Sequence, residues 1–452
     1  MIDDAREQEF VREGIVTLED LELAIAEQRP VTADPVLRRA GPLLADERRP
    51  VTLGRAWDIL ESLIGALAAR CPEIQPLEPA GGVRRVEPLV TTISLVGRSR
   101  DPARSLEEIL TLPILATVLH RTAARALVLL DGHEIDIRVA SPAEHGTVMF
   151  TATGPADHIV DVLRRREPRP QASETEVYAQ AGLAYLPPET RGSAGALETA
   201  AKPFPRLVDR SDIRGDLHMH TTYSDGHDAL RKMVDAAAAL GYEYIAITDH
   251  SEHASAGHTI DADGLKHQRD EIENVRASAG GMTIYQGIEV DILPDGSLDC
   301  PDEILASLDI VLASLHEGAG HDRGTLTRRY LNAIRHPLVS VITHPSNQLV
   351  GYRAGYDLDY DAIYAAAVET GTALEVDGAP VHLDLSGERA RDAIRSGVTL
   401  VIDSDCHRAR LLDRQMRFGV GTARRGWVQP RHVLNTRRAA DVAAFIARKR
   451  TA

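Results

Sequence analysis

The sequence is poor in cysteine, has no long hydrophobic run and carries no excess of positive charge. Its three cysteines, Cys71, Cys300 and Cys406, lie far apart and form no CxxC pair, which argues against a disulfide framework and favours a reducing, cytoplasmic location. No apolar run approaches the roughly 18 residues that a membrane-spanning helix needs. The acidic start, MIDDAREQEF, does not have the basic and then apolar pattern of a signal peptide. We therefore expect a cytoplasmic protein with no membrane partner.

The formal net charge is −16. This charge argues against a protein that coats nucleic acid non-specifically, because such proteins present a basic surface. It does not exclude a phosphate-containing substrate, since divalent cations in a carboxylate-rich pocket reverse the local charge.

Composition and periodicity divide the 452 residues into four segments. We expect a helical N-terminal region over 1–52, a small α+β domain over 53–165, an extended linker over 166–211 and a larger α/β domain over 212–452. The α+β prediction rests on an amphipathic helix over 53–70 and four strand-like runs, TTISLVG, ARALVLLDG, HEIDIRVA and TVMFTATG. The linker prediction rests on the proline- and glycine-rich stretches REPRPQ, YLPPE and TRGSAG.

Strand-like apolar runs alternate with helical stretches from residue 212 onward. The runs are GDLHMH, YEYIAITDH, MTIYQGIEVDI, LDIVLASLH, VSVITH, TALEVD and VTLVIDSDCH. Seven strands that alternate with helices predict a parallel β/α barrel, closed or nearly closed. Periodicity alone does not separate a barrel from an open doubly wound sheet, so that alternative stays open.

Residues of metal-ligand type recur where these runs end. Histidines or carboxylates end the first, second, fourth, fifth and seventh runs, a glutamate lies late in the third, and an aspartate follows the first. The C-terminal ends of barrel strands meet at one face, so residues distant in sequence would lie together there. The candidate ligands are His218, His220, Asp225, His250, Glu289, His316, His344, Asp405 and His407.

Six imidazoles and three carboxylates form a mixed nitrogen and oxygen donor set. Such a set suits zinc, manganese or iron better than calcium or magnesium. Nine ligands are too many for one ion and predict two or three divalent ions, with a carboxylate as a bridge. Clustered ions suit the hydrolysis of phosphate esters, because they lower the pKa of a bound water and neutralise phosphoryl oxygens.

These motifs resemble the PHP (polymerase and histidinol phosphatase) family over residues 212–450. The resemblance rests on HMH, SDG, TDH, GIEVDI, SLH, THP and SDCH. It implies a distorted seven-stranded (β/α) barrel of PHP type with a trinuclear metal site. It also implies three ligand sets, which are His218, His220, Glu289 and Asp405; Glu289 as a bridge with His316 and His344; and Asp225, His250 and His407.

Other segments resemble the C-terminal module of bacterial family X DNA polymerases. They are DILPDGSLDCPDE, GYRAGYDLD, MRFGVGTARRGWVQP and LVDRSDIRGDLHMHT. This resemblance implies a manganese-dependent 3′–5′ exonuclease and phosphoesterase.

The N-terminal half resembles a reduced, nucleotidyltransferase-like polymerase core. GIVTLEDLE resembles the start of a helix-hairpin-helix region, but the glycine-rich hairpin is absent. EPAGGVRRVEPLVTTISLV resembles the polymerase palm motif, in which a Gly-Ser pair precedes two aspartates. Gly82 replaces the serine of that pair, Thr92 and Ser94 replace the two aspartates, and Asp136 matches a third carboxylate. Neutral hydroxyls cannot replace carboxylates around Mg²⁺. We therefore expect that polymerase activity is lost, that Asp136 is a surface strand residue, and that this half docks partners or orients the substrate.

Further candidates lie near the ends of the runs. Arg353 could hold a substrate phosphate or could be an ordinary exposed arginine. Glu375 and Asp377 end the sixth run and could support the ligand histidines, although the resembling modules usually have asparagine at the position of Asp377. We expect His253 and His258 to be solvated loop residues.

Three functions remain in competition. The leading hypothesis is a 3′–5′ exonuclease that acts on DNA 3′ ends. The alternative is a phosphatase that acts on a small phosphomonoester, such as histidinol phosphate or a nucleotide, and the altered palm, the missing hairpin and the acidic charge favour it. The third is a non-enzymatic scaffold that binds DNA or a DNA-repair protein partner, which has no need of nine metal ligands.

Overall fold

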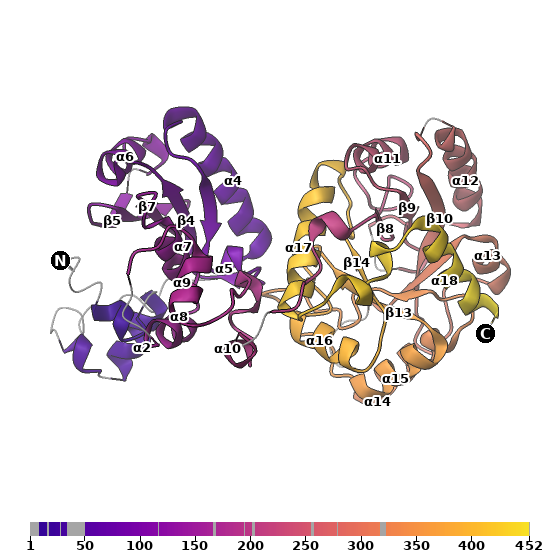
Figure 1. Cartoon of the computed structure of the whole chain (residues 1–452). Helices are drawn as coiled ribbons and strands as arrows, with labels where there is room; N and C mark the ends of the chain where they lie inside the picture. Colours follow the sequence, from indigo (N-terminus) through magenta and orange to yellow (C-terminus); the bar gives the residue numbers. More distant parts are fainter. Residues whose placement is uncertain are drawn as a thin grey trace. The chain divides into compact units, whose positions relative to one another are not determined.

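The computed structural model describes residues 9–15, 18–27, 29–33, 50–115, 117–165, 169–193, 195–200, 204–254, 257–277, 279–316 and 322–451. The chain forms two compact units, unit 1 over Met1–Pro205 and unit 2 over Arg206–Ala452 (Figure 1). Much of the helical region expected over 1–52 lies outside the described residues, which include there the helix α2 (Leu18–Ala26).

Unit 1 is built on a mixed five-stranded sheet in the order β2-β4-β7-β6-β5. Strands β4 and β7 are parallel, and the other neighbouring strands are antiparallel. The strands of unit 1 are β1 (Val51–Thr52), β2 (Leu77–Ala80), β3 (Leu89–Val90), β4 (Ile93–Arg98), β5 (Thr117–Arg121), β6 (Arg125–Leu130) and β7 (His133–Ala140). Its further helices are α4 (Leu53–Arg70), α5 (Gly81–Arg84), α6 (Pro102–Ile109), α7 (His145–Thr153), α8 (Ala156–Leu163), α9 (Glu174–Gln180) and α10 (Ala196–Thr199).

Helix α4 has the bounds that the sequence predicts. The Thr52 hydroxyl accepts a hydrogen bond from the Arg55 backbone amide at its N-terminus, which satisfies one of the unpaired donors of the first turn. Leu53, Leu60 and Leu67 are among its buried residues, so one apolar stripe faces the sheet. Three of the four strand-like runs also form strands, as β4, β6 and β7.

The fourth run, TVMFTATG, does not form the predicted strand and lies instead in α7. Met149 and Phe150 are buried, and the helix ends at Gly154, whose φ of +70° suits glycine. Short apolar runs are ambiguous because periodicity does not separate a buried strand from a buried helix.

The segment expected to be an extended linker, 166–211, folds over much of its length. Helix α9 packs against α7. Glu174 accepts a hydrogen bond from Arg84 (2.6 Å) and pairs with Arg191 (2.8 Å), and both Glu174 and Arg191 are buried. The pair with Arg84, which is distant in sequence, attaches this proline- and glycine-rich segment to the rest of unit 1, and local composition does not indicate it.

Asp136 occupies the core of the five-stranded sheet of unit 1. The expectation that it lies on the surface is wrong, because the residue is 3% exposed. Its carboxylate accepts hydrogen bonds from Arg125 (2.8 and 3.3 Å) and Arg138 (2.9 and 3.0 Å). Its neighbour across the β4–β7 pair is Ser94. Two guanidinium groups therefore compensate the charge of this buried carboxylate.

Unit 2 is a parallel sheet of seven strands in sequential order, β14-β13-β12-β11-β10-β9-β8. The strands are β8 (Gly215–Asp216), β9 (Tyr244–Ile247), β10 (Thr283–Asp291), β11 (Ile310–Ser314), β12 (Val341–Ile342), β13 (Ala373–Asp377) and β14 (Leu400–Asp403). The helices are α11 (Leu230–Ala239), α12 (Ala262–Arg276), α13 (Asp302–Ser307), α14 (Arg323–Arg335), α15 (Tyr360–Thr370), α16 (Gly387–Arg395), α17 (Leu412–Arg425) and α18 (Ala439–Thr451).

The two outer strands, β8 and β14, are joined just beyond their ends. The His220 amide donates to the Cys406 carbonyl (3.0 Å), and Met219 and Cys406 form a parallel bridge. The Asp403 carboxylate accepts from the Leu217 amide at 2.7 Å. These contacts close the sheet into a nearly complete barrel, so the predicted barrel is confirmed and the open sheet is excluded.

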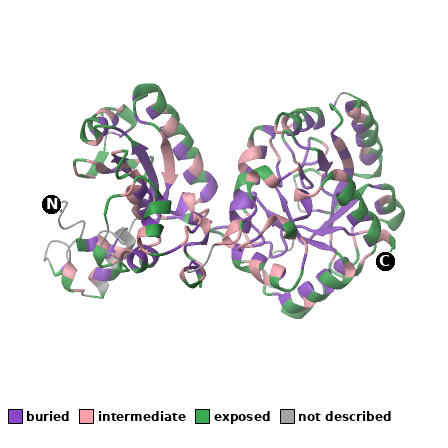
Figure 2. Cartoon of the chain, in the orientation of Figure 1, coloured by how far each residue is buried: buried purple, intermediate pink, exposed green. Residues whose placement is uncertain are grey.

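Helices cover the outside of the barrel, and its strands are buried (Figure 2). Val442, Phe445 and Ile446 of α18 belong to the same inner cluster of buried residues as Leu217 and Tyr244. The Tyr244 hydroxyl, at the start of β9, donates to the Arg437 carbonyl. The C-terminal helix thus packs at the end where the strands begin and leaves the opposite end for loops.

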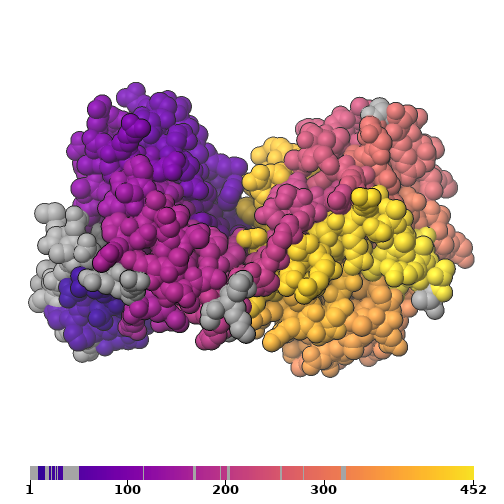
Figure 3. All heavy atoms as spheres, viewed as in Figure 1, coloured from indigo at the N-terminus to yellow at the C-terminus, as the bar shows by residue number. Residues whose placement is uncertain are grey.

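The first residues of unit 2 lie against its C-terminal part (Figure 3). The Val208 amide donates to the Val428 carbonyl and the Arg214 amide donates to the Asn435 carbonyl, both at 2.9 Å. Among the helices of the described ranges, none has both the length and the hydropathy needed to cross a lipid bilayer.

We expect Asp136→Asn to lower the free energy of unfolding of unit 1 by about 3–5 kcal/mol, because it leaves two guanidinium groups without their counter-charge. Urea unfolding is followed by the fluorescence of Trp57, in α4, in a Trp427→Phe background that retains one of the 2 tryptophans. Glu107→Gln, which breaks an exposed pair with Arg121, is the matched control and costs less than about 1 kcal/mol.

The Asp136 carboxyl also makes the stability of unit 1 depend on pH. Burial raises the pKa of the Asp136 carboxyl, but Arg125 and Arg138 outweigh burial and lower the pKa from 3.8 to about 2. Because the pKa is lower in the folded state, the stabilisation is complete above about pH 4 and is lost as the pH falls through 2, which amounts to about 2 kcal/mol. Asp136→Asn should lack this loss, and a variant that loses stability as steeply as the wild type would contradict the assignment.

Candidate metal centre

All nine candidate ligands lie at the end of the barrel where its strands finish. His218 and His220 follow β8, and His250 follows β9. Glu289 lies near the C-terminal end of strand β10. His316 and His344 come two residues after β11 and β12. Asp405 and His407 follow β14, and Asp225 lies between β8 and α11. The convergence of parallel strands therefore brings together side chains that span almost 190 residues of sequence.

One group of donor atoms surrounds the end of the Glu289 side chain. His218 Nε2 and His220 Nε2 lie 3.1 Å from each other, and 3.4 and 3.6 Å from Glu289 Oε2. Asp405 Oδ1 lies 3.1 Å from His220 Nε2. Four donor atoms at these separations could ligate one ion.

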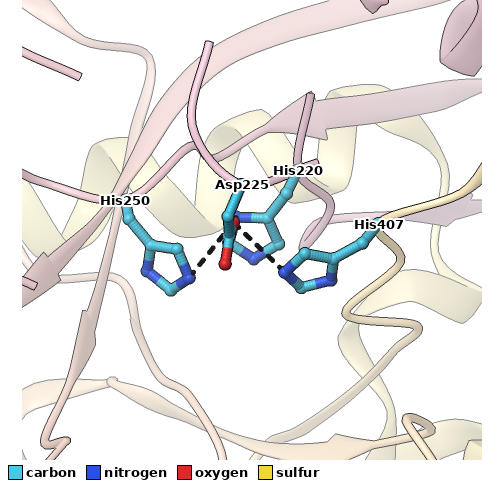
Figure 4. A group of neighbouring side chains, drawn as sticks. All are labelled: His220, Asp225, His250 and His407. Carbon is cyan, nitrogen blue, oxygen red and sulfur yellow. Dashed lines mark ion pairs between the residues drawn. The ribbon is translucent and has the colours of Figure 1, made fainter. Parts of the chain in front are cut away.

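Two further groups adjoin the first. Glu289 Oε1 lies 2.8 Å from His344 Nε2 and 3.9 Å from His316 Nε2. Asp225 Oδ1 lies between the rings of His250 and His407, 3.7 and 3.3 Å from their Nε2 atoms (Figure 4). The groups share Glu289, whose two oxygens face different histidines.

Three of the histidines have their outer ring nitrogen held by an acceptor. His218 Nδ1 donates to Glu375 Oε1 (2.7 Å) and His316 Nδ1 donates to Asp291 Oδ1 (2.6 Å). His407 Nδ1 donates to the backbone carbonyl of Asp405 (3.0 Å). A proton on Nδ1 leaves the Nε2 lone pair directed into the cluster, which is how proteins orient histidines that bind metals.

The backbone at two candidate ligands adopts the left-handed region. His344 has φ +26° and Asp405 has φ +47°, a conformation that non-glycine residues rarely adopt and that neighbouring contacts must stabilise. The His344 amide donates to Glu375 Oε2 at 2.6 Å. Glu375 therefore supports both His218 and His344, as the sequence predicts.

The charges of the cluster are strongly coupled. Burial lowers the pKa of His344, but Glu289, Glu375 and Asp405 outweigh burial and raise it to about 9. Burial, together with His407 and His250, lowers the pKa of His220 to about 3. Burial raises the pKa of Glu289, but the neighbouring His250 and His218 hold it well below its usual range. Buried carboxylates this close together need positive charge beside them.

The donor set fits divalent metal ions. Glu289 Oε2, His220 Nδ1 and His344 Nδ1 are buried and have no hydrogen-bond partner among the described residues. Several nitrogen and oxygen atoms with lone pairs thus lie close together, and cations among them reduce their mutual repulsion. Histidine with carboxylate is the donor combination of zinc, manganese and iron sites.

A cavity of about 430 Å³ opens at the cluster. It is lined by Asp225, His250, Glu289, His316, His344, Ala379, Pro380, Val381, His382, Asp405, His407 and Gln415. The loop after β13 forms one side of this cavity, and His382 stacks on His344 with ring centroids 4.9 Å apart. His382 Nδ1 donates to the Gln348 carbonyl at 2.9 Å.

Sequence reasoning did not identify three supporting residues. His382 follows its strand by five residues, so no pattern at the strand end includes it. Asp291 could have been noticed as the polar residue two positions after Glu289 on the same face of β10. Asp249 is buried and accepts hydrogen bonds from Thr221 and Ser224, which fixes the loop that carries Asp225.

Arg353, His253 and His258 lie outside the cluster, whereas Asp377 has a carboxylate oxygen within 4.8 Å of ligand atoms of His382 and Asp405. Arg353 is not among the residues that line the cavity, and its Nη2 donates to the Asn347 carbonyl at 2.9 Å. His253 and His258 are exposed loop residues, as expected, and His253 Nδ1 pairs with Asp299. The Asp377 carboxylate is buried and accepts from the Ala379 amide at 2.6 Å.

The chain is similar in sequence to known proteins. Residues 216–361 match the PHP domain family model. A protein of Bacillus subtilis (strain 168) named DNA polymerase/3′-5′ exonuclease PolX is 36% identical over 390 residues, which cover 82% of this chain and 68% of that protein. A protein of Thermoanaerobacter sp. (strain X514) named as a probable phosphatase is 32% identical over 205 residues, 42% of this chain and 78% of that protein.

Among solved structures, histidinol phosphate phosphatase of Lactococcus lactis, complexed with zinc, L-histidinol and phosphate, matches with a TM-score of 0.35 and 19% identity. That match covers 46% of this chain and 93% of the other. The PolX alignment is longer than unit 2 and therefore extends into unit 1. Together with the PHP-domain match, this relationship shows that the chain belongs to the PolX family of PHP-domain proteins.

Proposed function

We propose that this protein is a metal-dependent phosphoesterase that removes nucleotides from the 3′ ends of DNA, with Mn²⁺ as its ion. The observation that carries the proposal is the convergence of six imidazoles and three carboxylates at one end of the barrel, where seven of these nine side chains line a cavity of about 430 Å³. A cavity of this size suits a small ligand and is too small for a duplex. This favours attack at a strand end over cleavage within a helix.

Each part of the site has a role in this proposal. Glu289 would bridge two ions, with His218, His220 and Asp405 on one side and His316 and His344 on the other, and Asp225, His250 and His407 would hold a third. Bound ions would supply charge to the phosphoryl oxygens and lower the pKa of a water. Glu375 and Asp291 orient His218 and His316 through their Nδ1 atoms. Arg353 remains a proposed phosphate contact that would require its side chain to leave the Asn347 carbonyl.

Unit 1 has no catalytic role in the proposal. Ser94 stands opposite Asp136 in the β4–β7 pair, and Arg125 and Arg138 already bind the Asp136 oxygens. Nucleotidyl transfer needs Mg²⁺ beside carboxylates, and two guanidinium groups there oppose it. Unit 1 would instead orient the strand or dock a DNA-repair protein in the cytoplasm.

A small-molecule phosphatase is the second candidate. It is supported by the relatives named as phosphatases, which are similar over about two-fifths of this chain, and by the formal charge of −16, which repels a long polyanion. A non-enzymatic scaffold is the third, and a complete ligand set argues against it.

The activity is tested with purified full-length chain, Mn²⁺ and 5′-labelled single-stranded DNA, in parallel with a panel of small phosphomonoesters. We expect a ladder of shortened products that retain the 5′ label. Phosphate release from the panel alone would support the second candidate, and no turnover of either with metal bound would support the scaffold. The same preparation should not extend a primer–template, and template-directed synthesis would contradict the inactive role of unit 1.

Metal binding is tested separately through Glu375. Glu375→Gln removes the charge that holds His218 Nδ1 and the His344 amide, so we expect Mn²⁺ affinity to fall roughly 10- to 100-fold. Calorimetric titration of metal-free protein measures the dissociation constant, and circular dichroism checks the fold. Glu252→Gln, an exposed glutamate on the loop after His250, is the matched control. Unchanged affinity in Glu375→Gln would contradict the ligand assignment.

A further inference from the structure

Tyr352 is unusual among the aromatic residues of this chain. All 2 Trp, 11 Tyr and 5 Phe residues lie in the described ranges. Among them Tyr352 alone is exposed, with 86% of its surface accessible, while the others are buried or half-buried. A single exposed apolar residue needs no explanation by itself, so its position decides whether it has a role.

Tyr352 lies on a loop that begins two residues after the candidate ligand His344. We call residues 346–356 the rim loop. The Leu349 amide donates to the Arg353 carbonyl (2.9 Å), the Tyr352 amide donates to the Leu349 carbonyl (2.8 Å), and the Tyr356 amide donates to the Ser346 carbonyl (2.7 Å). These bonds fold the loop back on itself, so the backbone that carries Tyr352 has a defined conformation.

The rim loop is also bonded to the segment that lines the cavity. The Val350 amide donates to the Val381 carbonyl at 2.8 Å. Gln348 Nε2 donates to the His382 carbonyl at 2.7 Å, and His382 Nδ1 donates in return to the Gln348 carbonyl. Val381 and His382 both line the cavity. Tyr352 therefore lies on a loop that is hydrogen-bonded to two residues of the cavity lining, two positions along the chain from Val350.

The edge itself is apolar at this point. Val381 is 43% exposed, and together with Ala379 and Pro380 it forms the apolar part of a cavity lining that otherwise consists mainly of histidines and carboxylates. Tyr352 and Val381 thus form a pair of exposed apolar side chains on two hydrogen-bonded loops. A hydrolytic site that needed only to bind phosphate would have no use for such a pair.

We propose that Tyr352 stacks on the base of the 3′-terminal nucleotides and so makes the site specific for single-stranded nucleic acid. The proposal rests on the exonuclease function proposed above and names what recognises its substrate. Aromatic side chains bind single strands by stacking on bases, irrespective of sequence, because every base offers a flat face. The rigid rim loop presents the ring without a large loss of conformational freedom. Tyr352 then contributes to binding and not to the hydrolytic step.

The test compares Tyr352→Ala and Tyr352→Phe with the wild type, all as Mn²⁺-loaded full-length chain. KM and kcat are measured with a 5′-labelled single-stranded oligonucleotide and, separately, with glycerol 2-phosphate, which has no base. We expect Tyr352→Ala to raise KM for the oligonucleotide roughly 5- to 100-fold, as for the loss of one stacked base. Its kcat, and its hydrolysis of glycerol 2-phosphate, should not change. Tyr352→Phe, which keeps the ring, should restore KM.

Two controls make the result specific. Val368→Ala removes an apolar side chain that is 47% exposed on α15, and it should leave KM for the oligonucleotide unchanged. An oligonucleotide that lacks its 3′-terminal bases should bind the wild type as weakly as the intact strand binds Tyr352→Ala.

Each contrary result has a distinct meaning. If the wild type shortens the oligonucleotide and Tyr352→Ala has the same KM as the wild type, base stacking is refuted. The exposed ring would then be available to contact a protein partner. If Tyr352→Ala loses activity on the oligonucleotide and on glycerol 2-phosphate to the same extent, the residue has a structural role and the proposal also fails. If the wild type does not shorten DNA at all, the exonuclease function fails, and the role of Tyr352 fails with it.

Discussion

The site depends on one electrostatic constraint, which is that buried carboxylates and histidine lone pairs point at one another. Glu289 is fully buried, and its two oxygens face donor atoms from four different strand ends. Such an arrangement is stable only with positive charge among the donor atoms. Protons on the histidines can supply part of that charge, and divalent ions can supply it in a form that polarises a phosphate. The rest of unit 2 serves to hold these groups in place.

The fold of unit 2 was predictable because strand-like runs and helical stretches alternate regularly along its sequence. Seven apolar runs alternate with helices, and each predicted run contains one of the strands β8 to β14. Closure was not predictable, because it rests on side chains that substitute for ladder hydrogen bonds, such as Asp403 with the Leu217 amide. Family membership was also predictable, since several short motifs at the strand ends all resemble those of the PHP family.

Unit 1 was harder to predict because several of its charged residues are buried in ion pairs that the pattern of the sequence does not indicate. The burial of Asp136 comes from Arg125 and Arg138 on neighbouring positions of the sheet. Glu174 attaches a proline-rich segment through Arg84 and Arg191, and no local composition indicates this. The prediction for TVMFTATG was wrong for a different reason, since its seven apolar or β-branched residues before the glycine fit a buried helix as well as a strand.

At the candidate site, the sequence identified the residues that end strands and missed those that support them from loops. The nine predicted side chains come together, and Glu375 holds two of them. His382 and the rim loop come from connections whose course no periodicity predicts. Tyr352 could not be singled out from the sequence, because only its exposure and the hydrogen bonds of its loop to the cavity lining separate it from the other tyrosines.

The most direct measurement is anomalous X-ray diffraction from crystals grown with Mn²⁺, with data collected on both sides of the manganese absorption edge. Two or three anomalous peaks should appear among the nine side chains, about 2 Å from their nitrogen and oxygen atoms, with Glu289 between two of them. A map with no peak at this cluster, or with the histidine rings turned away from it, would contradict the account.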